Sequence, residues 1–283
     1  MTTTVFLVVI GAALLHAAWN GFVKGSPDKF ASMCALSLGH FPIAALAALT
    51  LPLPAPESWP FLITGVLLHL GYQIVLAMAY RAGDLSQVYP IARGVAPLLV
   101  AAISVAVLGV QLLLPELIGI AVIGAGILSL ALVRKSDGLR NPVAAALALL
   151  TGGFIAAYSL VDGYGARASG SPVAFYAWLS MGTALCFCLV MALWKPGVIR
   201  RAVTDHKRLG LFGGSASFVA FAMVMWAFTQ APIPLVTALR ETSIVFALLI
   251  GVFFLKERLN LVKLAATLAA LLGAALLRFA RHF

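Results

Sequence analysis

Residues 90–99 read PIARGVAPLL and residues 237–246 read TALRETSIVF, so an arginine recurs inside an apolar segment at a constant spacing of 147 residues. The same spacing pairs Gly126 with Gly273 without a gap. A spacing that stays constant over several tens of residues indicates a chain built from two related halves. Each half keeps an arginine among apolar neighbours, and the function of these two arginines is the central question.

The composition indicates whether those arginines lie in a water-soluble or a membrane protein. Hydrophobic residues make up 63% of the 283 residues, charged residues only 10%, and the mean hydropathy is +1.06. These values lie far from those of soluble globular domains, which excludes that class and predicts an integral membrane protein. A helix of about 20 apolar residues spans a bilayer core, and ten such segments are expected at residues 4–23, 31–51, 59–80, 86–109, 113–133, 142–161, 172–193, 209–230, 233–255 and 260–280.

Ten spans divided between two related halves give five helices to each half. An odd number per half means that the second half enters the membrane inverted relative to the first, as in many secondary transporters. We therefore predict an all-α integral membrane protein with ten transmembrane helices in two inverted five-helix repeats, residues 1–137 and 138–283. A substrate would bind near the membrane midplane, and transport would proceed by alternating access between the repeats.

The charged residues predict an orientation and argue against nucleic acid as the partner of this basic chain, whose formal charge is +10. Three of the 19 Lys and Arg residues lie in one set of alternate loops, Arg167, Arg278 and Arg281, and 14 in the other. By the positive-inside rule the basic loops are cytoplasmic, which places both termini outside. The expected location is the cell membrane, the inner membrane if the source is bacterial. Monomer and homodimer both stay open.

Several stretches resemble a known family. ALRETSIVFALLIGVFFLKERL (238–259) and LKERLNLVKLAATLAALLGAALL (255–277) look like the EamA family of the drug/metabolite transporter superfamily, and the resemblance extends over the chain. HAAWNGFVK (16–24) with VYPIARG (88–94) resembles one branch, some members of which are associated with phosphonate utilisation genes. The resemblance implies a ten-helix transporter, usually an exporter, of small metabolites or drugs. The family's Gly-Glu-Arg-like turn is present as Lys-Glu-Arg at 256–258, but the first half has Val-Gln-Leu at 110–112.

Arg93 and Arg240 are the first candidates for substrate binding. A cation inside a membrane costs at least about 2.5–3.5 kcal/mol on insertion scales, so each should face a partner or a polar path. Arg93 has no acidic residue within one helical turn, and Glu241 follows Arg240 directly, where it does not share a helix face. Arginine is a fixed donor suited to planar oxyanion groups. A structural role, with pairing to Glu241 or to carbonyl groups, is the alternative.

Polar stripes supply the remaining candidates. His16, Asn20 and Lys24 recur on one face of the first segment, while His69, Gln73 and Tyr80 do so on the third. Interhelical hydrogen bonding would explain any single residue, but together they suggest one polar central cavity. The full set of substrate-binding candidates is Arg93, Arg240, His16, Trp19, Asn20, His69, Gln73, Tyr80, Tyr89, Tyr158, Trp226 and Glu241.

Pro90 and Pro97 flank Arg93 on one face and are predicted to act as hinges. Each removes one backbone donor from the helix, so the fourth segment should bend or open there, unless the prolines serve ordinary packing. Cys34, Cys186 and Cys188 lie within predicted spans and suggest neither a metal site nor a disulfide framework.

The sequence favours a secondary transporter, and within that class an exporter, of small organic metabolites with an anionic or zwitterionic group. Neither a phosphate-cradling motif nor a catalytic motif is present, so an ATP-driven pump and an enzyme are not expected, and no cofactor or metal is implied. Protons are a candidate coupling ion, with His16 and His69 as carriers. The first alternative is broad-specificity efflux of apolar or cationic drugs. The second, from another class, is a non-transporting membrane scaffold or sensor.

Overall fold

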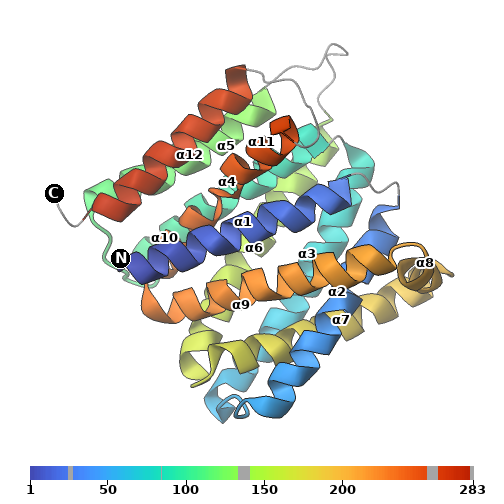
Figure 1. Cartoon of the computed structure of the whole chain (residues 1–283). Coiled ribbons are helices and arrows are strands. Elements are labelled where there is room, and N and C mark those ends of the chain that lie inside the picture. Colours follow the sequence, from blue (N-terminus) through green and yellow to red (C-terminus); the bar gives the residue numbers. More distant parts are fainter. Residues whose placement is uncertain (25–27, 84, 133–140, 254–260, 281–283) are drawn as a thin grey trace. The chain divides into compact units, whose positions relative to one another are not determined.

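The computed structural model describes residues 1–24, 28–83, 85–132, 141–253 and 261–280, and every regular element in these ranges is helical (Figure 1). The long helices are α1 (Thr3–Lys24), α2 (Lys29–Thr50), α3 (Trp59–Ala82), α4 (Leu85–Ala106), α5 (Leu114–Ser129), α6 (Pro142–Ala168), α7 (Pro172–Trp194), α9 (Ser215–Gln230), α11 (Ser243–Phe253) and α12 (Leu261–Phe279). The short elements are η1 (Pro56–Ser58), η2 (Leu130–Leu132), α8 (Val198–Thr204), the π-helical η3 (Leu209–Gly214) and α10 (Ile233–Arg240).

Within the described residues, nine helical segments are long and apolar enough to cross a membrane. They match nine of the ten predicted spans, and the chain is a multi-pass membrane protein. The predicted span 113–133 differs, because α5 has only 16 residues and continues as the 3-10 turn η2. The helix starts at Leu114, within one residue of the prediction, with Pro115 in its first turn, so the difference lies at the other end, where α5 stops at Ser129. A tenth full-length span is therefore not established.

The helices fall into two compact units. Unit 1 comprises Met1–Ile10, Gly71–Leu160 and Ala231–Phe283, and unit 2 comprises Gly11–Leu70 and Val161–Gln230. Each unit thus combines helices from both halves of the sequence, and α1, α3 and α6 each contribute to both units. The predicted boundary between repeats at residues 137 and 138 falls outside the described residues, as does the Lys-Glu-Arg turn at 256–258.

In unit 1, α5 packs along α12 and α4 packs against α10. The first of these contacts depends on two glycines. A Cβ on Gly119 would lie 3.0 Å from the carbonyl oxygen of Gly273, and one on Gly273 would lie 2.7 Å from that of Gly119. Further along α5, Gly126 faces Ala269 on α12. Because residue numbers rise along α5 as they fall along α12, the two helices are antiparallel.

In unit 2, α2 packs along α7 and against η3. Phe30 at the start of α2 meets Trp194 at the end of α7, with ring centroids 6.2 Å apart. His40, further along α2, lies 6.4 Å from the ring of Tyr176 near the start of α7. This pair of helices is therefore antiparallel too. In the sequence, SPDKF (26–30) and SPVAF (171–175) lie 145 residues apart and mark the starts of these two segments, so each helix packs against its expected counterpart from the other half.

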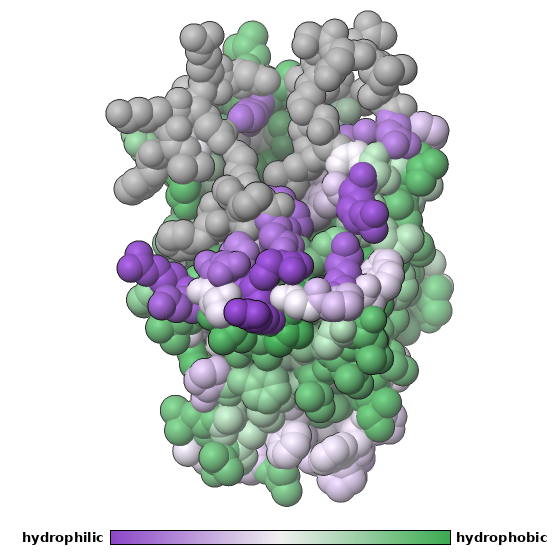
Figure 2. Space-filling view, turned by 90° about the vertical axis from the view of Figure 1, so that its right-hand side faces the viewer, coloured by the Kyte–Doolittle hydropathy of each residue, from purple (hydrophilic) through white to green (hydrophobic). Residues whose placement is uncertain are grey.

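The outer faces of these helices are apolar. Leu46 and Leu49 on α2 are largely exposed, as are Leu185, Leu189 and Leu193 on α7. Figure 2 shows one face on which hydrophobic residues cover most of the described surface, while hydrophilic residues gather in one region. Water would disfavour so many exposed leucines, whereas lipid tails solvate them, so these surfaces indicate contact with a bilayer.

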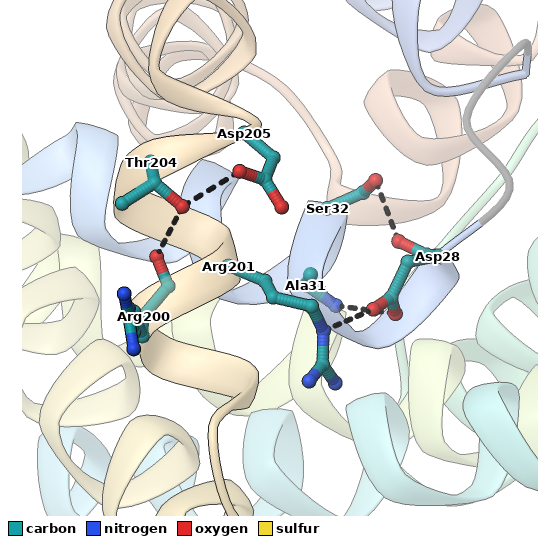
Figure 3. A network of polar contacts seen from close by, with 7 residues as sticks. All are labelled: Asp28, Ala31, Ser32, Arg200, Arg201, Thr204 and Asp205. Atoms are coloured by element: carbon teal, nitrogen blue, oxygen red, sulfur yellow. Dashed lines mark hydrogen bonds and ion pairs between the residues drawn. The ribbon is translucent and has the colours of Figure 1, made fainter.

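One polar network ties the start of α2 to α8 (Figure 3). Asp28 caps α2: its Oδ1 accepts a hydrogen bond of 3.0 Å from the Ala31 amide. Its Oδ2 accepts a 2.9 Å bond from Nε of Arg201 on α8. The Ser32 hydroxyl donates to the Asp28 carbonyl oxygen at 2.8 Å. Asp28 therefore stabilises the helix start and holds α8 beside it.

The charge of Asp28 gives this contact a pH dependence. Partial burial acts to raise the pKa of Asp28, but the Ala31 hydrogen bond and the Arg201 guanidinium outweigh it, so the pKa lies below the ordinary value of 3.8. A lowered pKa in the folded state means that the carboxylate stabilises the fold above the unfolded-state pKa. This stabilisation is lost as pH falls through the folded-state pKa.

We expect Asp28→Asn to lower stability by no more than about 1 kcal/mol at pH 7, because asparagine still caps the helix and the ion pair is partly exposed. The difference between this variant and the wild type should stay constant from about pH 5 to 8 and shrink below about pH 4. Thermal unfolding in detergent across this pH range measures it. Arg201→Gln should produce the same loss, and the double variant no more than either one; additive losses would contradict the pairing.

Candidate functional site

Helix α4 brings Tyr89 and Arg93 to one face. They are four residues apart, and the guanidinium carbon of Arg93 lies 5.9 Å from the centroid of the Tyr89 ring. Arg93 is buried, with 6% of its surface exposed. The helix runs unbroken through Pro90 and Pro97, both buried. The predicted opening of this helix is therefore absent, and a hinge role for the two prolines stays a prediction.

The interruption lies instead in the counterpart segment. The predicted single helix 233–255 is two helices, because α10 ends at Arg240 and α11 begins at Ser243. The amides of Glu241 and Thr242 donate to carbonyls three residues earlier, and the Thr242 hydroxyl donates to the Leu239 carbonyl at 2.7 Å. These short-range bonds replace the α-helical pattern for one turn and satisfy the backbone groups that the break would otherwise expose.

Glu241, in this interruption, pairs with the arginine of α4. Its Oε2 lies 2.9 Å from Nε of Arg93, and the exposed fractions of the two side chains are 2% and 8%. Among the described residues, neither Arg93 Nη2 nor Glu241 Oε1 has a hydrogen-bond partner. The structural alternative for Arg240, pairing with Glu241 or with carbonyl groups, did not include this contact, in which Glu241 reaches across to α4. Arg93 is thus compensated in charge but retains donor capacity.

Arg240 and three tyrosines complete the site. The charge of Arg240, which is buried, acts on Glu241, Tyr89 and Tyr72. Tyr72 on α3 meets Tyr158 on α6 edge to face, with ring centroids 5.5 Å apart. We call the following residues of unit 1 the arginine cluster: Tyr72, Tyr89, Arg93, Tyr158, Arg240 and Glu241.

Further polar groups border the arginine cluster. Tyr80 on α3 interacts electrostatically with Tyr72, Tyr89 and Arg93. The Tyr89 side chain hydrogen-bonds to Ser243 at the start of α11. Sequence reasoning did not select Tyr72 or Ser243. The polar run Arg-Glu-Thr-Ser at residues 240–243, inside an apolar segment, is the signal that could have identified the latter.

Unit 2 holds five of the other predicted site residues, and unit 1 holds Gln73. On α1, the rings of His16 and Trp19 meet edge to face at 4.9 Å, and Asn20 donates to the His16 carbonyl oxygen at 3.0 Å. His69 on α3 pairs with Asp162 on α6. Trp226 is half-buried on α9. Whether these residues share one cavity with the arginine cluster stays a prediction.

The cluster combines charged side chains and tyrosine rings that are suited to binding an ion. Two arginines and one glutamate leave one positive charge in excess, and tyrosine rings surround it. Across the described ranges, no three His, Cys, Asp or Glu side chains come together in a way that could hold a metal ion. An excess positive charge with spare N–H donors suits an oxyanion group, which two such donors can bind together.

The sequence model of the EamA-like transporter family matches residues 143–279. This segment, just under half of the chain, is an EamA-like transporter sequence. This confirms the resemblance noted in the sequence and the prediction of a membrane protein of the transport class; a non-enzymatic role is consistent with it. The arginine cluster of this EamA-like protein takes Arg240 and Glu241 from the matched region and Arg93 from outside it.

Comparison with solved structures shows the same fold over the whole EamA-like chain. One crystal structure aligns with a TM-score of 0.74 and 19% sequence identity, covering 98% of this chain and 96% of that chain. At this identity the likeness concerns the fold alone. No curated protein matches the sequence.

If Arg93 and Glu241 compensate each other, losing one should cost more than losing both. Glu241→Met leaves two buried guanidinium groups without their carboxylate and should lower stability by roughly 3–5 kcal/mol, since uncompensated like charges remain among apolar groups. The double variant Arg93→Met, Glu241→Met should recover much of that loss. Thermal unfolding of the purified protein in detergent measures both variants. Losses that simply add would show that the two side chains do not interact.

Proposed function

We propose that the chain is a secondary transporter, of the exporting kind, for small organic metabolites that carry an anionic or zwitterionic group. Its family membership supports transport in general. The observation that carries the substrate class is the buried ion pair of Arg93 and Glu241 beside Arg240, which leaves one positive charge inside an apolar unit. A single oxyanion group on the substrate would neutralise this excess.

Helix packing supports alternating access between inverted repeats. α5 with α12, α2 with α7 and α4 with α10 are each made of one element from the first half and its counterpart from the second. The residue contacts described above run in opposite chain directions in all three pairs, including Arg93 with Glu241 and Tyr89 with Ser243. Antiparallel counterparts are what two copies of one five-helix unit would produce if the second were inverted in the membrane.

The ion pair implies that an anionic substrate competes with Glu241 for the guanidinium groups. An incoming carboxylate or phosphonate would bind the guanidinium groups in place of Glu241, which already occupies Nε of Arg93. Binding energy would then go into separating a pair that otherwise closes α4 on the interruption between α10 and α11. Since a ligand shifts a conformational equilibrium only by its differential affinity, this separation is a direct way for substrate to favour one state.

The orientation follows the charge asymmetry of the loops: basic loops in the cytoplasm and both termini outside. The tyrosines around Glu241 favour one competing function, the efflux of cationic or apolar compounds, because aromatic rings and a carboxylate also suit a cation. In that case Glu241 would bind substrate and the arginines would be structural.

Transport assays with charge-preserving variants separate these functions. We expect Arg93→Lys and Arg240→Lys to retain the positive charge but lose the planar pair of donors. Counterflow of radiolabelled 2-aminoethylphosphonate, glutamate or taurine into proteoliposomes should fall at least tenfold, about 1.4 kcal/mol if expressed as binding. Arg200→Lys, on the exposed side of α8, is the matched control and should transport like the wild type.

Wild-type rates in well-folded lysine variants at both positions would reject the anion site. Counterflow of tetraphenylphosphonium that depends on Glu241, with no counterflow of the three anionic probes, would support cation efflux instead. No counterflow of any probe would favour a scaffold or sensor.

A further inference from the structure

A second buried acid-base pair lies in unit 2. Nε2 of His69 on α3 lies 2.7 Å from Oδ2 of Asp162 on α6. The Asp162 side chain is fully buried and that of His69 is 12% exposed. Sequence analysis selected His69 for its polar stripe but did not connect it with Asp162, which lies 93 positions away.

The surroundings of the pair are shaped to hold a carboxylate. Gly65 lies one turn before His69 on the same face of α3, and a Cβ at this position would lie 2.8 Å from Asp162 Oδ1. Any other residue would therefore press on the carboxylate. Within the described chain, Oδ1 has no hydrogen-bond partner, so Asp162 interacts through one oxygen and retains an acceptor.

The other groups that face the pair are neutral or titratable. The Phe221 ring of α9 lies 6.4 Å from the His69 ring and stacks on Tyr176 of α7. His40 on α2, which contacts Tyr176 and Phe218, is close enough for its charge to act on His69. None of these neighbours is a permanent cation. The pair therefore differs from Arg93 and Glu241, where one partner is always charged.

We propose that His69 and Asp162 form a proton-binding site, and, resting on the proposed transport function, that its proton is exchanged for the solute. With a neutral imidazole the pair carries one negative charge. Uptake of one proton gives an imidazolium beside a carboxylate, which carries no net charge and keeps the hydrogen bond. Because a buried net charge is costly in a membrane, binding and release of the proton change the energy of unit 2 substantially.

The geometry supports reversible protonation better than a permanent structural bond. A structural carboxylate of this kind is usually satisfied at both oxygens, whereas Asp162 engages one. The His69 side chain keeps 12% of its surface exposed, so the pair is not sealed completely. Histidine also titrates nearest to neutral pH, which lets a physiological pH gradient load and empty the pair.

Nuclear magnetic resonance of the full-length protein in lipid nanodiscs, with 15N-labelled histidine, tests proton binding without a substrate. The His69 ring should change protonation between about pH 4.5 and 9, with the assignment made from His69→Gln. In Asp162→Asn the midpoint of this change should differ from that of the wild type, because the imidazole loses the carboxylate oxygen that lies 2.7 Å from its Nε2. A ring that does not titrate, or a midpoint that Asp162→Asn leaves in place, overturns the proposal.

Proteoliposomes test the coupling, with 2-aminoethylphosphonate as the probe. The wild type should perform counterflow without a pH gradient and accumulate the probe when a gradient is imposed. Asp162→Asn should keep counterflow within about twofold but lose at least fivefold of the gradient-driven accumulation. Asp28→Asn makes the same chemical change at the start of α2 and should keep both activities.

Each transport outcome has a separate meaning. Accumulation that survives in Asp162→Asn, or wild-type counterflow that no gradient can drive uphill, overturns the coupling. A wild type that fails in counterflow with this probe counts against the proposed function, while the resonance titration decides the proton site by itself. Lower counterflow together with lower thermal stability in Asp162→Asn would identify a structural pair and overturn the proposal as well.

Discussion

A charge held among apolar helices must meet an opposite charge, and the contact between Arg93 and Glu241 satisfies that requirement in unit 1. The local structure around it follows. The helix stops at Arg240, the chain makes a tight turn, and Glu241 reaches Arg93 on α4. Tyrosines fill the space around the pair and offer hydroxyl groups as well as ring faces. A continuous helix through residues 240–243 would bring neither Ser243 nor Glu241 into the same relation to α4.

The two buried pairs have different chemistry. A guanidinium stays protonated under all physiological conditions, so the Arg93 pair presents a constant charge to a solute. The His69 pair changes its charge by one unit with a single proton. The first lies wholly in unit 1 and the second wholly in unit 2. A protein that keeps a constant charge in one unit and a variable charge in the other has the elements needed to relate solute binding to proton binding.

Much of the fold was predictable from the sequence. Apolar runs gave nine spans, and the repeated arginines indicated that Arg93 and Arg240 belong to one arrangement; both lie in unit 1. The pairings were not predictable. No glycine or proline interrupts residues 235–250, so helix propensity favours a continuous helix where the structure has a break. His69 and Asp162 lie on stripes of different helices, and periodicity within a helix does not say which stripes meet. Those contacts depend on interhelical packing, including the room that Gly65 provides.

The mixed origin of the compact units has a consequence for how the protein is made. Helix α2 packs on α7, and α5 packs on α12, so these helices of the first half bury one face against helices that are synthesised much later. During translation α5 is synthesised well before α12, so lipid covers the glycine face of α5 until α12 has been inserted. Contacts between distant parts of a sequence slow folding and prolong the exposure of partly assembled surfaces. Membrane insertion would therefore precede assembly by most of the synthesis time, and a ribosome stalled midway would leave both units without their packing partners.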